Sequence, residues 1–68
     1  MLSEIEKFML GKFNLFTEIL PAKHDRIHEG AMVAKLLHDP ANRFSLQQLQ
    51  EAVHKLVHES KHYQVIDR

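Results

Sequence analysis

Histidines are the residues of this chain whose type and spacing could do chemistry. His54, His58 and His62 lie four residues apart, and His24 and His28 repeat that spacing. Side chains at positions i and i+4 of an α-helix share one face, so each neighbouring pair could hold a transition-metal ion. Three in a row cannot converge on one ion, because eight residues of helix span about 12 Å and metal–nitrogen bonds are only about 2 Å long. The row from His54 to His62 is therefore a candidate metal site built from pairs.

The segment from His58 to His62 has the H-E-x-x-H pattern and resembles the zinc metallopeptidase signature over five residues. In that signature two histidines hold zinc and the glutamate activates a bound water. Here Lys61 would put a cation beside the metal, and only six residues follow, too few for a helix that brings a third ligand. The chain shows no other nucleophile–base pair and no phosphate-binding glycine loop. We therefore expect no enzyme and no cofactor.

The direction of the histidine row favours a simpler interpretation. The apolar face of its helix is centred between Leu49 and Leu56, and the three histidines point roughly 130–210° away from it. The row then belongs to the side of the helix that faces solvent. We interpret it as a polar face that uses histidine, and metal binding and a pH-sensitive interface stay open as alternatives.

Composition limits what else the chain can be. It has 68 residues, no cysteine, nine basic and nine acidic side chains, and 44% hydrophobic residues. This is enough for one core and too little for two domains or a barrel. A core of this size without disulfides rarely supplies more than about 3–5 kcal/mol of stability, and oligomerisation is a usual supplement.

No apolar run is long enough for a signal peptide or a membrane span, so we expect a cytoplasmic protein without membrane contact.

Two prolines divide the chain into three helical segments. The apolar spacing predicts helices at about 3–20, 22–38 and 45–62 within one domain, residues 1–68. The predicted fold is all-α: a small three-helix domain of helical hairpins with short proline-marked turns, completed by dimerisation. The end of the chain, 64–68, is expected to fray or to form a short extended tail.

The helix ends carry their own signals. Ser3 with Glu6, and Ser45 with Gln48, have the spacing of capping boxes and predict where the first and third helices begin. Pro21 suits the first turn of the second helix, where its missing N–H costs nothing. It is also expected to end the first helix, because the residue before a proline disfavours helical dihedral angles.

More apolar surface is predicted than three short helices can cover. An apolar stripe runs along the first helix, and the second half of the second helix is apolar almost all round. An exposed patch of this kind usually marks an interface. We therefore expect a small regulatory or adaptor protein that binds a second copy of itself, as a homodimer, or another protein. The candidate interface residues are Phe8, Leu15, Phe16, Ile19, Met32, Val33 and Leu36.

A DNA-binding regulator is the alternative from a different class. The pattern Phe44-Ser45-Leu46, followed by Leu49 and Val53, looks like the first helix of a helix-turn-helix unit. The zero net charge and the lack of a basic stripe argue against nucleic acid as a partner. If the third helix did meet DNA, the contacts would come from Gln47, Gln50, Lys55 and Lys61.

Overall fold

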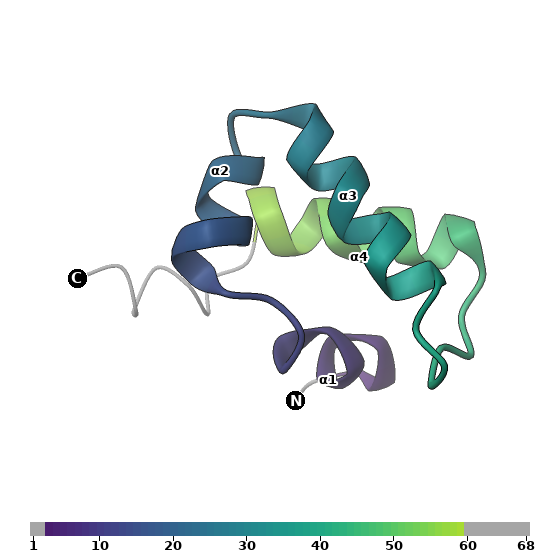
Figure 1. Ribbon diagram of the computed structural model, residues 1–68. Helices are drawn as coiled ribbons and strands as arrows, with labels where there is room; N and C mark the ends of the chain where they lie inside the picture. The colour runs from purple at the N-terminus through teal and green to yellow at the C-terminus, as the bar shows by residue number, and fades with distance from the viewer. Residues whose placement is uncertain (1–2, 60–68) are drawn as a thin grey trace.

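The computed structural model describes residues 3–59 of the chain. In that range it contains four α-helices, one π-helical turn and no β-strand (Figure 1). No helix among these residues has both the length and the apolar character needed to cross a bilayer. The all-α prediction is confirmed, whereas the count of three helices is not. The elements are α1 (Glu4–Leu10), η1 (Leu15–Ile19), α2 (Leu20–Ala22), α3 (Arg26–Leu37) and α4 (Leu46–His58).

The first helix begins as predicted and ends early. The Ser3 hydroxyl accepts a hydrogen bond from the Glu6 backbone N–H, and the Glu6 carboxylate accepts one from the Ser3 backbone N–H. The helix then stops at Gly11, about halfway along the predicted 3–20 range. A glycine inside a helix costs about 1 kcal/mol relative to alanine, so this is a weak position for continuation. The predicted first helix is therefore two separate pieces.

Asn14 starts the second piece. Its side-chain oxygen accepts hydrogen bonds from the backbone N–H groups of Phe16 and Thr17, at 2.9 and 3.1 Å. The Asn14 backbone N–H donates in return to the Glu18 carboxylate at 2.8 Å. This bond, with a smaller contribution from Lys35, lowers the pKa of Glu18. Asn14 thus acts as a helix cap, the role in which asparagine is most favourable.

Pro21 lies in the first turn of a helix, as predicted, but Leu20 before it keeps helical dihedral angles, so the proline does not end the helical winding as expected. The π-helical turn η1 runs directly into α2, which contains Pro21. In η1 the Ile19 N–H bonds the Asn14 carbonyl at 3.1 Å, five residues back. A proline removes the bond to the carbonyl four residues back. In the preceding turn η1 the regular pattern of backbone hydrogen bonds to the carbonyl four residues back is already interrupted. The ring of Pro21 is therefore accommodated at this point.

The second predicted helix is shorter than expected, and the third begins close to its predicted start. The second begins at Arg26 instead of 22, because the Asp25 carboxylate accepts a hydrogen bond from the Ile27 N–H at 2.9 Å and caps α3 there. The third begins at Leu46 with the predicted capping box of Ser45 and Gln48 in place. Its predicted continuation to 62 and the tail at 64–68 lie outside the described residues.

The core forms around α4, which packs chiefly on α3 and on another side meets α1 (Figure 1). The break after α1 lets η1 and α2 fold back against α3, so the apolar faces of the first two predicted segments cover each other. The prediction that one chain could not cover them is wrong for most of these residues, whereas Phe16 and Leu37 stay exposed. The buried residues are Met9, Leu15, Ile19, Ala22, Met32, Val33, Leu36, Leu49, Val53, Leu56 and Val57.

Leu36→Ala should destabilise the fold itself. Leu36 is fully buried, and a leucine-to-alanine change in a core costs about 2–5 kcal/mol. That is as much as a core of this size supplies, about 3–5 kcal/mol. We expect the variant to be largely unfolded by far-ultraviolet circular dichroism at 25 °C. Leu37→Ala, at the half-exposed next position, is the control and should stay folded. A folded Leu36→Ala that had only lost a partner would contradict the structure.

Gly30→Ala should stabilise the protein. Gly30 lies within α3, and a Cβ added there meets nothing within 4 Å. The substitution should add about 1 kcal/mol through helix propensity and raise Tm by roughly 4–8 °C in a domain of this size. Thermal melts followed by circular dichroism would measure it. The reciprocal change at the exposed neighbour, Ala31→Gly, should lower Tm by a similar amount. A lower Tm for Gly30→Ala would show that this part of α3 needs glycine.

Candidate functional site

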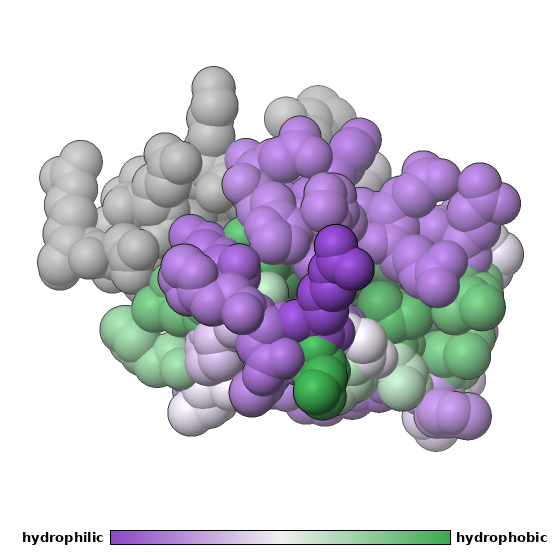
Figure 2. Space-filling view, turned by 90° about the horizontal axis from the view of Figure 1, so that it is seen from above, coloured by the Kyte–Doolittle hydropathy of each residue, from purple (hydrophilic) through white to green (hydrophobic). Residues whose placement is uncertain are grey.

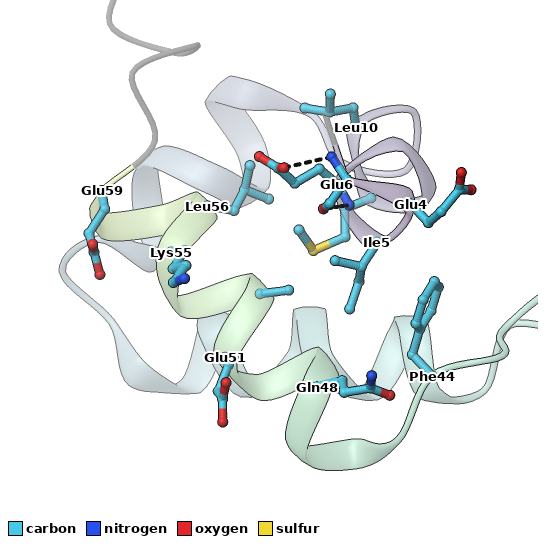
Figure 3. Close-up of a pocket in the computed structure, with 13 residues that line it drawn as sticks. Glu4, Ile5, Glu6, Leu10, Phe44, Gln48, Glu51, Lys55, Leu56 and Glu59 are labelled. Carbon is cyan, nitrogen blue, oxygen red and sulfur yellow. Dashed lines mark hydrogen bonds between the residues drawn. The ribbon is translucent and has the colours of Figure 1, made fainter. Parts of the chain in front are cut away.

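An apolar groove of about 860 Å³ lies between α1 and α4. It exists because α1 ends at Leu10 and covers only part of the length of α4. In Figure 3 the side chains of Ile5 and Leu56 point into the space between the two helices, and Phe44 stands at one end. The apolar lining consists of Ile5, Met9, Leu10, Phe44, Ala52 and Leu56.

The rim of this groove is acidic. Among the residues that the structure describes, four glutamates and one cation, Lys55, line it. Figure 3 shows Glu51, Lys55 and Glu59 spaced along α4, with Glu4 on the outer side of α1. An apolar floor with a negative rim suits an elongated ligand that is apolar on one face and positively charged at its edges. The acidic residues of the rim are Glu4, Glu6, Glu51 and Glu59.

One end of the groove is held by a cluster that joins the end of α1 to the turn before α4. The Phe8 and Phe44 rings are 5.6 Å apart between centroids, and the Lys12 ammonium lies 5.3 Å from the Phe8 ring. Lys12 also makes a salt bridge of 2.8 Å with Asp39. The hydrogen bond from Lys12 and a second one from the Ala41 backbone N–H lower the pKa of the Asp39 carboxyl. These contacts set the position of α1 against α4.

A second hollow of about 890 Å³ lies on the other side of α4, against α3. Here Glu29 of α3 meets His54 and His58 of α4. The Glu29 carboxylate Oε1 is 2.9 Å from Nε2 of His58 and 3.7 Å from Nδ1 of His54. The two imidazole rings are 4.5 Å apart between centroids. Two histidines and a carboxylate at this spacing are groups that can bind a metal ion.

The predicted interface residues separate into two groups. Leu15, Ile19, Met32, Val33 and Leu36 lie in the core of the single chain, where no partner could reach them. Of the remaining two, Phe8 is half-buried against the core. Phe16 is 66% exposed. The side of the molecule seen in Figure 2 carries its hydrophobic side chains in separate small groups among hydrophilic ones, not in one broad patch.

Of the residues predicted for DNA contact, Gln47, Gln50 and Lys55 are exposed on α4. Gln50 lines the hollow beside α3, whereas Lys55 lines the groove beside α1. Gln47 donates a hydrogen bond to Glu51 at 3.3 Å, which places a carboxylate where a phosphate would approach. Lys61 lies outside the described residues. The helix-turn-helix alternative stays a prediction.

Of the predicted metal-binding histidines, His54 and His58 lie together and His62 is outside the described residues. The residue that the sequence reasoning missed is Glu29. No local pattern connects it to His54 or His58, because it belongs to a different helix and is distant along the chain. The packing of α3 on α4 brings it to them.

The chain matches no protein-family model, no curated protein and no solved structure. Its own residues and their arrangement therefore carry the functional argument.

Asp39→Asn should lower Tm at neutral pH, and the deficit should close in acid. The pKa of Asp39 is lowered in the folded state, so its ion pair contributes stability above the unfolded carboxyl value of about 3.9. That contribution is lost as the pH falls through the lower, folded value. We expect the Tm difference between the two proteins to shrink steadily below about pH 4. Melts from pH 2 to 7 would measure it, and a difference independent of pH would contradict the assignment.

Proposed function

We propose that this protein is a small regulatory or adaptor module that binds a basic amphipathic helix of another protein in the groove between α1 and α4. The observation that carries the proposal is the apolar lining of the groove, which within residues 3–59 is bounded by four glutamates and one lysine. We keep the cytoplasm as the proposed place of action, with which a composition free of cysteine is compatible. We keep protein–protein interaction, the function predicted from the sequence. The contact residues that we now propose are those that line the groove.

The shape and lining of the groove favour a helix as the occupant. Two helices with a gap between them present a surface into which a third helix can lay its apolar face, a common mode of peptide recognition. Ile5, Leu10, Phe44 and Ala52 are only partly buried and would lose further contact with water on binding. Burial of apolar surface contributes roughly 25 cal/mol per Å². The free energy of binding would come from burial of side chains that are partly exposed in the single chain.

The rim determines the charge of the partner. Glu51 and Glu59 line the groove on the α4 side, and Lys55 is the one cation among the lining residues within 3–59. Lysine or arginine at the flanks of a bound helix would be attracted, and acidic flanks would be repelled. Complementary charges of this kind contribute mainly to association rate and specificity. Because the rim is exposed, the attraction should weaken as salt is added.

A pair of model peptides would test this proposal. One is a 14-residue amphipathic helix of leucine and lysine, and the other replaces every lysine with glutamate. We expect the protein to bind the fluorescently labelled basic peptide, with affinity falling as salt rises, and to ignore the acidic one. Fluorescence anisotropy would give Kd for both peptides.

Variants of the groove supply the control. Ala52 lines the groove, and Ala31 is exposed on α3 away from it. Ala52→Arg should weaken binding of the basic peptide by about tenfold or more, about 1.4 kcal/mol, whereas Ala31→Arg adds the same bulk and charge elsewhere and should not. Glu51→Lys, at an exposed site, reverses one rim charge with little risk to folding. Equal binding by all three variants would refute the groove as the site.

The predicted homodimer stays a prediction, and a second copy of the chain is the competing occupant of the groove. Light scattering would distinguish the two. A dimer that Ala52→Arg converts to monomer would mean that the groove serves self-association. A monomer that binds the basic peptide would support a different protein as the partner.

A further inference from the structure

We propose that Glu29, His54 and His58 form a binding site for a divalent transition-metal ion, best matched by Zn²⁺, between α3 and α4. The site is independent of the groove beside α1 and lies on the other side of α4. It differs from the row that the sequence suggests, because the third ligand is the carboxylate of Glu29 in place of His62. All three potential ligand atoms lie within 4.8 Å of one another.

Two of the three distances between the ligand atoms bracket the value expected around a tetrahedral ion, and all three atoms lie within 4.8 Å of one another. Ligands about 2.0–2.1 Å from zinc stand about 3.3–3.4 Å apart in that geometry. The two carboxylate–imidazole distances, 2.9 and 3.7 Å, lie on either side of this value. His54 and His58 are at i and i+4 on α4, which holds the two rings on one face. Small side-chain rotations would therefore place all three donors around one ion.

The partners of Glu29 support the same conclusion. Its salt bridges within residues 3–59 are to the two histidines and to no lysine or arginine. Its side chain is 24% exposed, so the carboxylate is partly withdrawn from water, while His54 and His58 are 58% and 36% exposed. An ion could thus enter from solvent and find a half-buried negative ligand. Imidazole with one carboxylate is a donor set that suits zinc, copper and nickel better than magnesium or calcium.

Other charged groups share the hollow. Lys23 and Arg26 also line it, and they would oppose a cation to some degree. Asp25, on the same lining, is paired with His28 at 2.8 Å and serves as the cap of α3. The three proposed ligands leave a fourth position for water or for a side chain of a partner.

A bound ion would join α3 to α4, the two helices that form most of the core. The chain is short and has no disulfide to supplement that core. Small domains of this kind often depend on a metal or a partner for stability. The ion would act by mass action, because it binds the folded arrangement and not the unfolded chain. The expected consequence is a protein whose stability depends on zinc.

Calorimetric titration of the full chain with zinc chloride, paired with thermal melts, would test the site. We expect one ion per chain, and a Tm raised by about 10 °C or more at a hundredfold excess of zinc over Kd. Magnesium chloride should have no effect. Glu29→Gln, His54→Gln and His58→Gln should each weaken zinc binding by at least about tenfold. Mutation of a residue that only hydrogen-bonds a metal ligand already lowers metal affinity by about that much.

Two histidines outside the site are matched controls. His38→Gln removes an exposed histidine at the end of α3 and should leave zinc binding unchanged. His62→Gln tests the row suggested by the sequence and should also leave it unchanged. The proposal would be overturned if zinc had no effect on the protein or if Glu29→Gln still bound zinc. It would also be overturned if only His62→Gln lost zinc binding. Circular dichroism without metal would confirm that every variant compared is folded.

Discussion

Burial of one face of α4 is the interaction on which the rest of this structure depends. Leu49, Val53 and Val57 are fully buried there, and α3 supplies much of what covers them. The apolar residues of η1 pack against α3 and complete the core. Because so few residues form this core, each contributes a large share of the total stability. The helix that carries the core therefore also determines which surfaces of the molecule remain open.

The short length of α1 explains the groove. The helix α1 ends at Leu10 with Gly11 as its C-cap, and the next helical piece begins after Asn14. This piece packs on α3. The same break thus closes the core on one side of α4 and leaves apolar side chains half covered on the other. A partner helix would complete the side that the chain itself does not.

The two proposed sites share α4 and lie on opposite sides of it. Lys55 and Glu51 border the groove beside α1, whereas His54 and His58 border the hollow beside α3. A metal ion at the hollow would fasten α3 to α4 without blocking the groove. The groove could then present the same surface to its partner on a more stable support. This arrangement assigns the histidines a structural role and the glutamate rim a recognition role.

The sequence by itself determined where two of the helices, α1 and α4, begin and that the fold is all-α. Ser3 with Glu6 and Ser45 with Gln48 form local contacts, so their spacing was enough to predict them. The tertiary structure alone decided that Leu15, Ile19 and Leu36 belong to the core and that Glu29 meets His54 and His58. Both outcomes depend on how helices that are distant along the chain pack on one another. Periodicity identifies an apolar face or a histidine pair, but it does not specify which part of the chain will lie against it.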